Sequence, residues 1–248
     1  LPFNRLTLNQ LNPGTTWQSP AVEPAQGSLF EQNITLSNRA PFDPQEVLGY
    51  LSTYPYGCVE QTTSASWNNL LLDNLIPGYN LPTADYPNQA ERYNNLSTAQ
   101  LRLANMQARD GGFGLWGGDQ TSVWLTAYVG DFLLGNKELA KKSFSQENML
   151  NRTLDYLYQS VNNADYSQLH RSTSDTTAYA YALYVLAKAG EQTQGALLKA
   201  LPIVAKESDI YPARLFILNA LLLQGEVGKV AEQMALIAQA PKAISFGY

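Results

Sequence analysis

The chain has 248 residues, of which 45% are apolar and 15% charged, and its formal net charge is −5. An acidic chain without a cluster of lysine or arginine is a poor partner for nucleic acid. One cysteine and one histidine exclude an intrachain disulfide framework and any cysteine-rich metal site, so we expect no metal and no cofactor.

The first 41 residues differ from the rest of the chain. They are rich in proline and contain two short stretches of alternating apolar and polar residues, around Leu6 and Ile34. This pattern is typical of extended chain and not of helix. We therefore expect residues 1–41 to be a linker or strand segment from a preceding domain.

From Asp43 onward, apolar residues recur at helical spacing. Asp43 followed by Pro44 is typical of a helix start and predicts a short helix to about Leu51. Eight longer helices are predicted at about 58–75, 90–109, 121–134, 146–160, 176–190, 194–205, 212–223 and 227–238. The richest apolar stretch, residues 215–223, is too short to cross a membrane.

Two of these helices, in segments 178–189 and 215–223, are apolar on nearly all faces, which indicates burial on both sides. Two-sided burial fits concentric rings of helices, and the alternative is an open solenoid of helix pairs. Residues 107–114 (QARDGGFG) resemble the Gln-x-x-Asp-Gly-x-aromatic turn of α/α toroid proteins, although an ordinary helix end capped by glycine has the same composition. We predict an all-α fold, an α/α toroid forming an incomplete, C-terminally truncated ring over residues 42–248.

The only cysteine, Cys58, is followed three positions later by Gln61. In the first turn of a helix this spacing places the two side chains next to each other. A thiolate held against the amide carbon of Gln61 can attack it and expel ammonia. The product is an internal thioester, and enforced proximity worth an effective molarity of about 10⁵ M or more drives its formation.

Neighbouring residues favour this reaction. Gly57 removes a side chain where the backbone must turn sharply, and the N-terminus of the predicted helix favours a thiolate. Tyr54 and Tyr56 flank the pair closely enough to keep water out, and a domain outside the chain can complete that cover. The alternative is that Cys58 is a small buried apolar residue and Gln61 a surface amide.

Residues 54–64 (YPYGCVEQTTS) closely resemble the thioester signature Gly-Cys-x-Glu-Gln of the α2-macroglobulin and complement family. The tyrosine-rich lead-in is most similar to the bacterial branch of that family. Residues 110–116, 124–133, 177–180 and 246–248 resemble later stretches of the same domain. The resemblance covers about residues 15–248 and is most specific at 50–64 and 110–134.

The resemblance implies a broad-spectrum protease inhibitor that reacts stoichiometrically and is not an enzyme. It implies that Cys58 supplies the thiol, Gln61 the acyl group, Glu60 the acidic residue of the motif, and Tyr54 a shield. After a protease cuts a bait region elsewhere in the parent chain, the exposed thioester captures a lysine amine of that protease. The implied partners are target proteases and other domains of the same polypeptide.

The bacterial resemblance also implies a place in the periplasm or cell envelope and a part in evading host defence. Attachment to the membrane would then depend on the parent chain and not on insertion of this segment. Some complement relatives use a histidine between the Asp-Gly-x-Phe turn and the next helix to pass the acyl group to hydroxyls. The corresponding interval, residues 114–123, contains no histidine, so we expect a preference for amines.

Three other functions remain open. A cysteine hydrolase would use Cys58 as nucleophile and His170 as base, although 112 positions separate them. A toroid enzyme of the terpenoid-cyclase kind would need clustered aspartates, and the sequence has none. A toroid binding module would line a groove with tyrosine and tryptophan and form no thioester.

Overall fold

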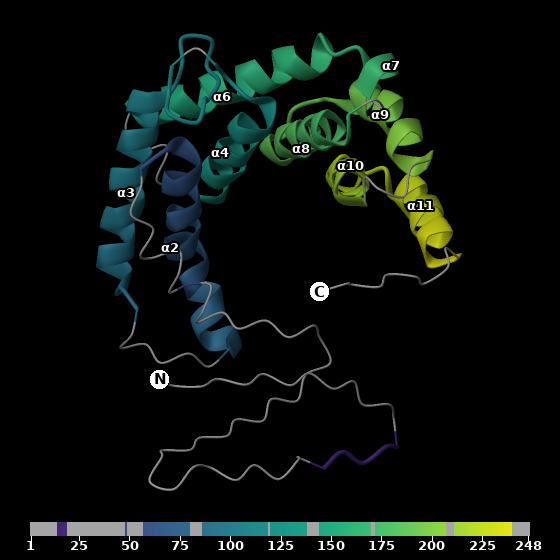
Figure 1. Cartoon of the computed structure of the whole chain (residues 1–248), viewed down its shortest axis with the longest axis horizontal. Coiled ribbons are helices and arrows are strands. Elements are labelled where there is room, and N and C mark those ends of the chain that lie inside the picture. The colour runs from purple at the N-terminus through teal and green to yellow at the C-terminus, as the bar shows by residue number, and fades with distance from the viewer. Residues whose placement is uncertain are drawn as a thin grey trace, which may run out of the picture. The chain divides into compact units, whose positions relative to one another are not determined.

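The computed structural model of the chain is shown in Figure 1. It describes residues 14–18, 48, 57–79, 86–118, 120–137, 144–169, 172–206 and 211–239. The chain divides into two compact units, Leu1–Phe42 and Asp43–Tyr248, and the described helices all belong to the second. The predicted strands of residues 1–41 lie outside the described residues, as does the predicted first helix except for Leu48, which is helical.

The described part of the chain is helical. Its helices are α2 (Val59–Tyr79), α3 (Gln89–Met106), α4 (Val123–Gly135), α6 (Phe144–Asn162), α7 (Tyr166–Leu169), α8 (Thr173–Ala189), α9 (Gln194–Lys206), α10 (Tyr211–Leu223) and α11 (Val227–Gln239). The described ranges contain no strand, only an isolated bridge between Leu115 and Gly117. The all-α prediction is confirmed.

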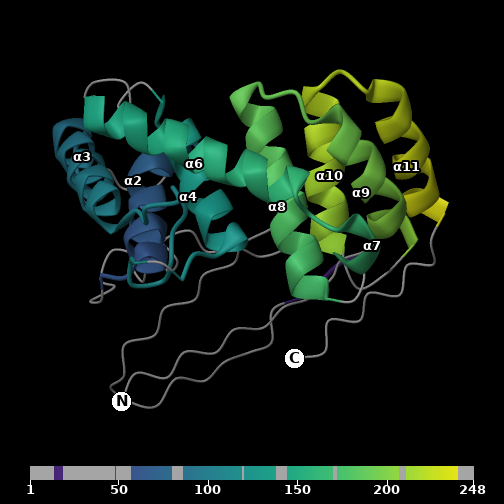
Figure 2. The same ribbon diagram turned by 90° about the horizontal axis from the view of Figure 1, so that it is seen from above.

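The helices form two rows, one inside the other. Figure 1 shows α2, α4, α8 and α10 in the inner row and α3, α6, α9 and α11 outside them. Figure 2 shows the same helices from above, with α2, α3 and α4 toward one end and α9, α10 and α11 toward the other. This is the predicted α/α toroid, and it explains why α8 and α10 are apolar on nearly all faces.

Polar side chains at the helix ends satisfy backbone groups that the helices leave free. Asn88 accepts hydrogen bonds from the first turn of α3, and Glu91 reaches back to the N–H of Asn88, which completes a capping box. Ser122 and Ser172 cap the inner helices α4 and α8. At the other end of α8, Gly190 adopts a φ of 93°, the left-handed conformation that commonly ends a helix.

Two clusters of buried side chains make up the core. The first fills the space among α2, α3, α4 and α6, and the second lies among α8, α9, α10 and the end of α6. Members of the first are Val59, Leu96, Leu103, Phe113, Leu125, Val129, Phe132, Leu133, Met149 and Leu150. Tyr128, Leu134 and Leu154 are half-buried and pack against both clusters, so the two form one continuous interior.

Three helix boundaries differ from the predictions by three residues or more, and one of them is the start of α8, at Thr173 and not at about 176. Helix α2 continues to Tyr79 through Pro77, four residues beyond the predicted end. Helix α3 ends at Met106 and not near Arg109, since Gln107 has an extended ψ of 128°. In the part of the chain with a described structure, no helix has the length and apolar character needed to span a bilayer.

Candidate functional site

The sulfur of Cys58 and the amide of Gln61 meet at the N-terminus of α2. The backbone N–H of Gln61 donates to Cys58 Sγ, and the backbone N–H of Cys58 donates to Gln61 Oε1, each at 3.4 Å. The carbonyl of Cys58 accepts the first hydrogen bond of the helix, from Thr62 N at 2.9 Å. This is the reciprocal arrangement of a capping box, with a sulfur in place of the usual hydroxyl. The helix start therefore holds both groups in one turn.

These contacts also orient the amide for attack at its carbon. The N–H of Cys58 points at Oε1 of Gln61, the oxygen on which negative charge builds up when a nucleophile adds to the carbonyl. A bond of 3.4 Å is long for an amide acceptor. It has room to shorten as charge develops, which is common for catalytic hydrogen bonds in a resting site.

Cys58 is shielded from solvent, whereas Gln61 is half-buried. Cys58 is 3% exposed and Val59 is fully buried. The N–H of Val59 donates to Leu115 O at 2.9 Å, which fastens the first turn of α2 to the loop between α3 and α4. The predicted shielding residues Tyr54 and Tyr56 lie outside the described residues, so their role stays a prediction.

At Gly57 the feature that favours glycine is a close approach by a flexible side chain and not a positive φ. A Cβ at this position would lie 1.7 Å from Nη2 of Arg102 in α3. The same Nη2 donates to Gly57 O at 2.9 Å. The guanidinium thus occupies the space where a side chain would begin. Nothing in the sequence around Arg102 relates it to a residue 45 positions earlier, so sequence reasoning misses it.

Glu60 ends a chain of hydrogen bonds that reaches across to α4. Ser64 Oγ donates to Glu60 Oε1 at 2.6 Å and lies 3.0 Å from the hydroxyl oxygen of Tyr128. Burial raises the pKa of Tyr128, the hydrogen bond with Ser64 opposes this rise, and the charges of Glu60 and Asp131 add to it. Tyr128 is therefore protonated at neutral pH and donates to Ser64. The spacing of Ser64 from Glu60 is visible in the sequence, but the contact with Tyr128 is not.

The loop between α3 and α4 is fixed by the residues of the Gln-x-x-Asp-Gly turn. Gln107 Nε2 donates to Gly111 O at 2.9 Å and to Met149 O of α6 at 3.1 Å. Asp110 Oδ2 accepts from Thr121 Oγ1 at 2.9 Å. Gly111 has a φ of 91°, which favours glycine. Since α3 has already ended, this is a turn in its own right and not an ordinary glycine cap.

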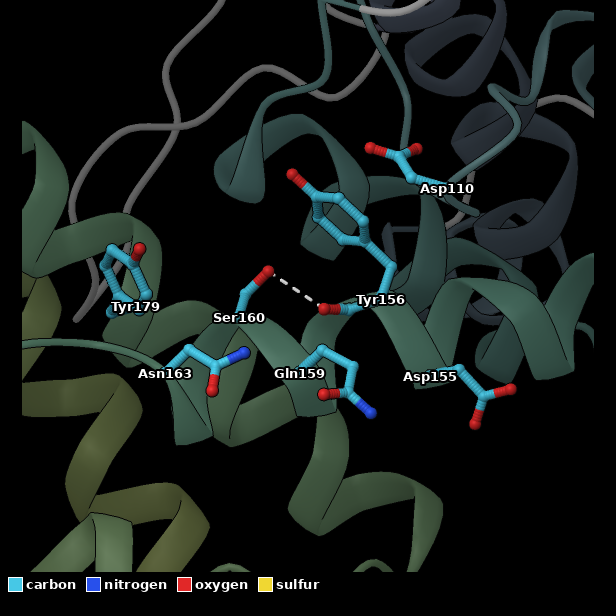
Figure 3. Close-up of a pocket in the computed structure, with 7 residues that line it drawn as sticks. All are labelled: Asp110, Asp155, Tyr156, Gln159, Ser160, Asn163 and Tyr179. Carbon is cyan, nitrogen blue, oxygen red and sulfur yellow. Dashed lines mark hydrogen bonds between the residues drawn. The ribbon is translucent and has the colours of Figure 1, made fainter.

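A shallow groove of about 400 Å³ lies beside this loop, between α6 and α8. Its lining residues are Asp110, Asp155, Tyr156, Gln159, Ser160, Asn163 and Tyr179. Figure 3 shows the carboxylates of Asp110 and Asp155 well apart, so they do not form a catalytic acid–base pair. Figure 3 also shows Ser160 Oγ donating to Tyr156 O, a 2.8 Å bond within α6. None of the four motif residues lines this groove.

The structure brings together Gly57, Cys58, Glu60 and Gln61 at one helix start. Among the residues that it describes, no three histidine, cysteine, aspartate or glutamate side chains are grouped so as to hold a metal ion. His170, the base of the alternative hydrolase, lies outside those residues. Acyl transfer within the Cys58–Gln61 pair is the chemistry that this site can perform.

Residues 26–173 match the model of one protein family, described as the A-macroglobulin TED domain. The chain is 30% identical over 242 residues to an α2-macroglobulin of Escherichia coli K12, and the match covers 94% of this chain and 14% of the relative. An α2-macroglobulin of Xylella fastidiosa Temecula1 is 36% identical over 107 residues, 42% of this chain and 6% of that protein. The chain thus spans a small part of these relatives.

Solved structures of bacterial α2-macroglobulins resemble the fold. The native E. coli protein from domain MG7 to the C-terminus aligns with a TM-score of 0.66 and 26% identity, covering 83% of this chain and 32% of that one. A Salmonella α2-macroglobulin reacted with methylamine aligns with a TM-score of 0.64 and 25% identity, covering 82% and 13%.

Proposed function

The chain belongs to the A-macroglobulin TED domain family, as part of a bacterial α2-macroglobulin, and from this premise we propose that Cys58 and Gln61 form an internal thioester that captures proteases. In this function a protease first cuts a bait region elsewhere in the parent chain. A lysine amine of the protease then attacks the acyl carbon of Gln61. The protein is consumed one molecule at a time, so it acts as an inhibitor and not as an enzyme.

The observation that carries the proposal is the pair of reciprocal contacts in which each side chain accepts from the backbone N–H of the other residue. Thioester formation joins Cys58 Sγ to Cδ of Gln61, and the amide nitrogen leaves as ammonia with the proton of the thiol. The capping-box contacts hold the sulfur and the amide side by side before any bond exists. The N–H of Cys58 then supports the oxygen of the tetrahedral intermediate.

Capture of a protease breaks the thioester bond and releases the thiol of Cys58. The amine nitrogen bonds to the acyl carbon of Gln61, the carbon–sulfur bond breaks, and Cys58 returns to a free thiol. Amines are the expected nucleophiles because the loop before α4 carries no histidine to pass the acyl group to hydroxyls. The Salmonella relative has been reacted with methylamine, a small amine of this kind.

A stored thioester needs cover until the moment of capture. Leu115, whose carbonyl holds the first turn of α2, is 52% exposed, and the adjacent Trp116 is 68% exposed. Exposed apolar residues beside a reactive bond suit a surface that another domain of the same polypeptide covers. We propose that this domain and Tyr54 together exclude water, in a parent protein held in the periplasm or at the cell envelope.

The test uses the full-length parent protein, purified gently. Its intact mass should be lower than the sequence mass by one ammonia, and methylamine should restore a nitrogen at Gln61 and release one titratable thiol. The matched control is Cys58→Ser, which retains a good N-cap residue but no sulfur. An unmodified Gln61 amide and no reaction with methylamine would leave only a helical binding module.

A further inference from the structure

Three side chains form a hydrogen-bonded relay that crosses from α4 to α2 and ends at Glu60, the residue before the acyl donor in the sequence. The Tyr128 hydroxyl donates to Ser64 Oγ at 3.0 Å, and Ser64 Oγ donates to Glu60 Oε1 at 2.6 Å. Tyr128 is itself held by stacking on Trp124, with ring centroids 5.4 Å apart. Glu60 is the second residue of α2 and lies between Cys58 and Gln61 in the sequence.

The behaviour of Ser64 distinguishes this relay from ordinary helix packing. Hydroxyl residues inside helices commonly donate to the backbone carbonyl four positions earlier. Thr63 and Ser66 in the same helix do this, to the carbonyls of Val59 and Thr62 at 2.7 and 2.6 Å. Ser64 donates to a carboxylate side chain instead. A glutamate that only stabilised the helix start would need no such partner.

Aminolysis creates a need for a proton acceptor at this place. When an amine adds to the acyl carbon, its nitrogen carries a surplus proton, and the departing sulfur carries a negative charge. A base that accepts this proton from the nitrogen and then passes it to the sulfur speeds such reactions by about 10²–10⁴-fold. Asp131, the other carboxylate whose charge acts on Tyr128, is occupied by Tyr181 at 2.9 Å and Lys188 at 2.6 Å.

We propose that Glu60 is the proton acceptor of the thioester reaction and that Ser64 and Tyr128 are its positioning residues. This inference rests on the proposed function. The amine lone pair forms the carbon–nitrogen bond at Gln61, and the electrons of the carbon–sulfur bond go to Cys58 Sγ. The proton passes from nitrogen to Glu60 and then to the sulfur. The products are an amide and a thiol, and Glu60 ends as it began.

The same residue serves thioester formation, since that reaction is the reverse of attack by ammonia. The thiol proton of Cys58 then passes through Glu60 to the leaving nitrogen of Gln61. Ser64 holds one oxygen of the carboxylate, and among the described residues no hydrogen bond to the other oxygen of Glu60 is seen. That oxygen is available for the proton.

The experiment follows thiol release from the full-length protein at several methylamine concentrations and fixed pH. We expect Glu60→Gln to lower the rate about 10²-fold. We also expect the order of the reaction in methylamine to rise from one toward two, because a second amine must then accept the proton. Added formate should partly restore the rate of Glu60→Ala. The matched control is Glu147→Gln, the same change in the first turn of α6.

The positioning residues are tested in the same assay. Ser64→Ala and Tyr128→Phe should each slow thiol release several-fold, whereas Tyr158→Phe on the exposed side of α6 should not. Formate should not rescue these two variants, since each keeps its carboxylate. A purely structural role would change the rate without changing the order in amine or giving rescue by formate.

The outcomes separate the two proposals. If the wild-type protein keeps its Gln61 amide, the proposed function fails. If the wild type reacts and Glu60→Gln matches its rate and its order in amine, only the role of Glu60 is overturned. If Glu60→Gln folds but forms no thioester, the rate of the Tyr128→Phe variant tests the relay instead. A wild-type rate in that variant contradicts the relay, and a slower rate or an unformed thioester supports it.

Discussion

The two halves of the helical unit are held by different kinds of contact. We call residues 57–137 the reactive half and residues 172–239 the scaffold half. In the reactive half, a Cβ on Gly114 would lie 2.4 Å from Gln120 O, whereas no heavy atom lies within 4 Å of one on Gly195 in the scaffold half. Close backbone approach occurs in the first half, and none of the described glycines of the second half shows it.

The cores of the two halves show the same difference. The core of the reactive half begins at Val59, next to Cys58, and is built on large side chains such as Phe132. The core of the scaffold half is rich in alanine and leucine from α8, α9 and α10. Chemistry needs atoms held within fractions of an ångström.

The largest expected effect is that of Gly111→Ala. Its left-handed backbone costs about 1–2 kcal/mol for a residue with a Cβ, and that Cβ would lie 2.4 Å from the backbone oxygen of Arg152. Overpacking adds about 1–3 kcal/mol. We expect a loss of about 4 kcal/mol, seen as a fall in Tm of about 10 °C for a chain of this size.

Gly118→Ala is the control for that variant. Gly118 has a similar φ of 82° but no atom within 4 Å of an added Cβ. Gly118→Ala should lower the stability only by the cost of the left-handed backbone, about 1–2 kcal/mol. Equal losses at the two positions would show that close approach does not stabilise the loop.

A matched pair of leucine truncations compares the two cores directly. Leu133 and Leu186 are both fully buried, one in each half. Each change to alanine should cost about 3 kcal/mol of stability. Only Leu133→Ala, which loosens the core that contains Val59, should speed hydrolysis of the thioester in the full-length protein. Similar hydrolysis rates in both variants would mean that the halves loosen together.

The helices were predictable because their signals are local. Apolar spacing and capping residues such as Ser122 lie within one helix turn of the feature they define. The short helix α7 (Tyr166–Leu169) was not predicted, because four residues are too few to show a period. The ring arrangement followed from helices apolar on all faces, together with the resemblance of residues 107–114 to a known turn.

The candidate site likewise has one part that the sequence could predict and one part that it could not. The Cys58–Gln61 pair was predictable, since three positions in one helix turn fix two side chains side by side. Its partners across the fold were not. Tyr128 lies 64 positions from Ser64, and only the packing of α2 against α4 brings the hydroxyls together. Contacts of this kind depend on tertiary structure and leave no local pattern.

Tyr166, in helix α7 between the two halves, should make the stability of the protein sensitive to alkali. Burial raises the pKa of Tyr166 to about 12, with a smaller contribution from Tyr179, and its hydroxyl donates to Val161 O at 3.0 Å. The folded state therefore binds this proton more tightly than the unfolded state, whose pKa is near 10.0. The resulting stability is complete below pH 10 and is lost as the pH rises toward 12.

The variant Tyr166→Phe tests this origin of the alkaline loss. It should cost about 1 kcal/mol at neutral pH, for the lost hydrogen bond. It should also flatten the fall in Tm between pH 10 and 12. Tyr158→Phe, at an exposed position of α6, should leave that fall unchanged. An unchanged slope in Tyr166→Phe would assign the alkaline loss to other groups.

The smallest expected effect has the opposite sign and isolates the difference between the halves. Gly195 lies in the first turn of α9, has an ordinary φ, and leaves open space for a Cβ. Gly195→Ala removes backbone freedom from the unfolded chain and should stabilise the protein by about 0.4–1 kcal/mol. A rise in Tm of about 1–4 °C is the corresponding signal.

The matched change in the reactive half is Gly114→Ala, because neither glycine has a positive φ. The gain in the unfolded state is the same at both positions, so the two variants differ only in what the added methyl group meets. At Gly114 it meets a backbone oxygen that cannot move aside without shifting the loop that holds Leu115 and, through it, the start of α2. Stabilisation at both positions would show that the loop yields easily and that close approach does not hold the reactive pair in place.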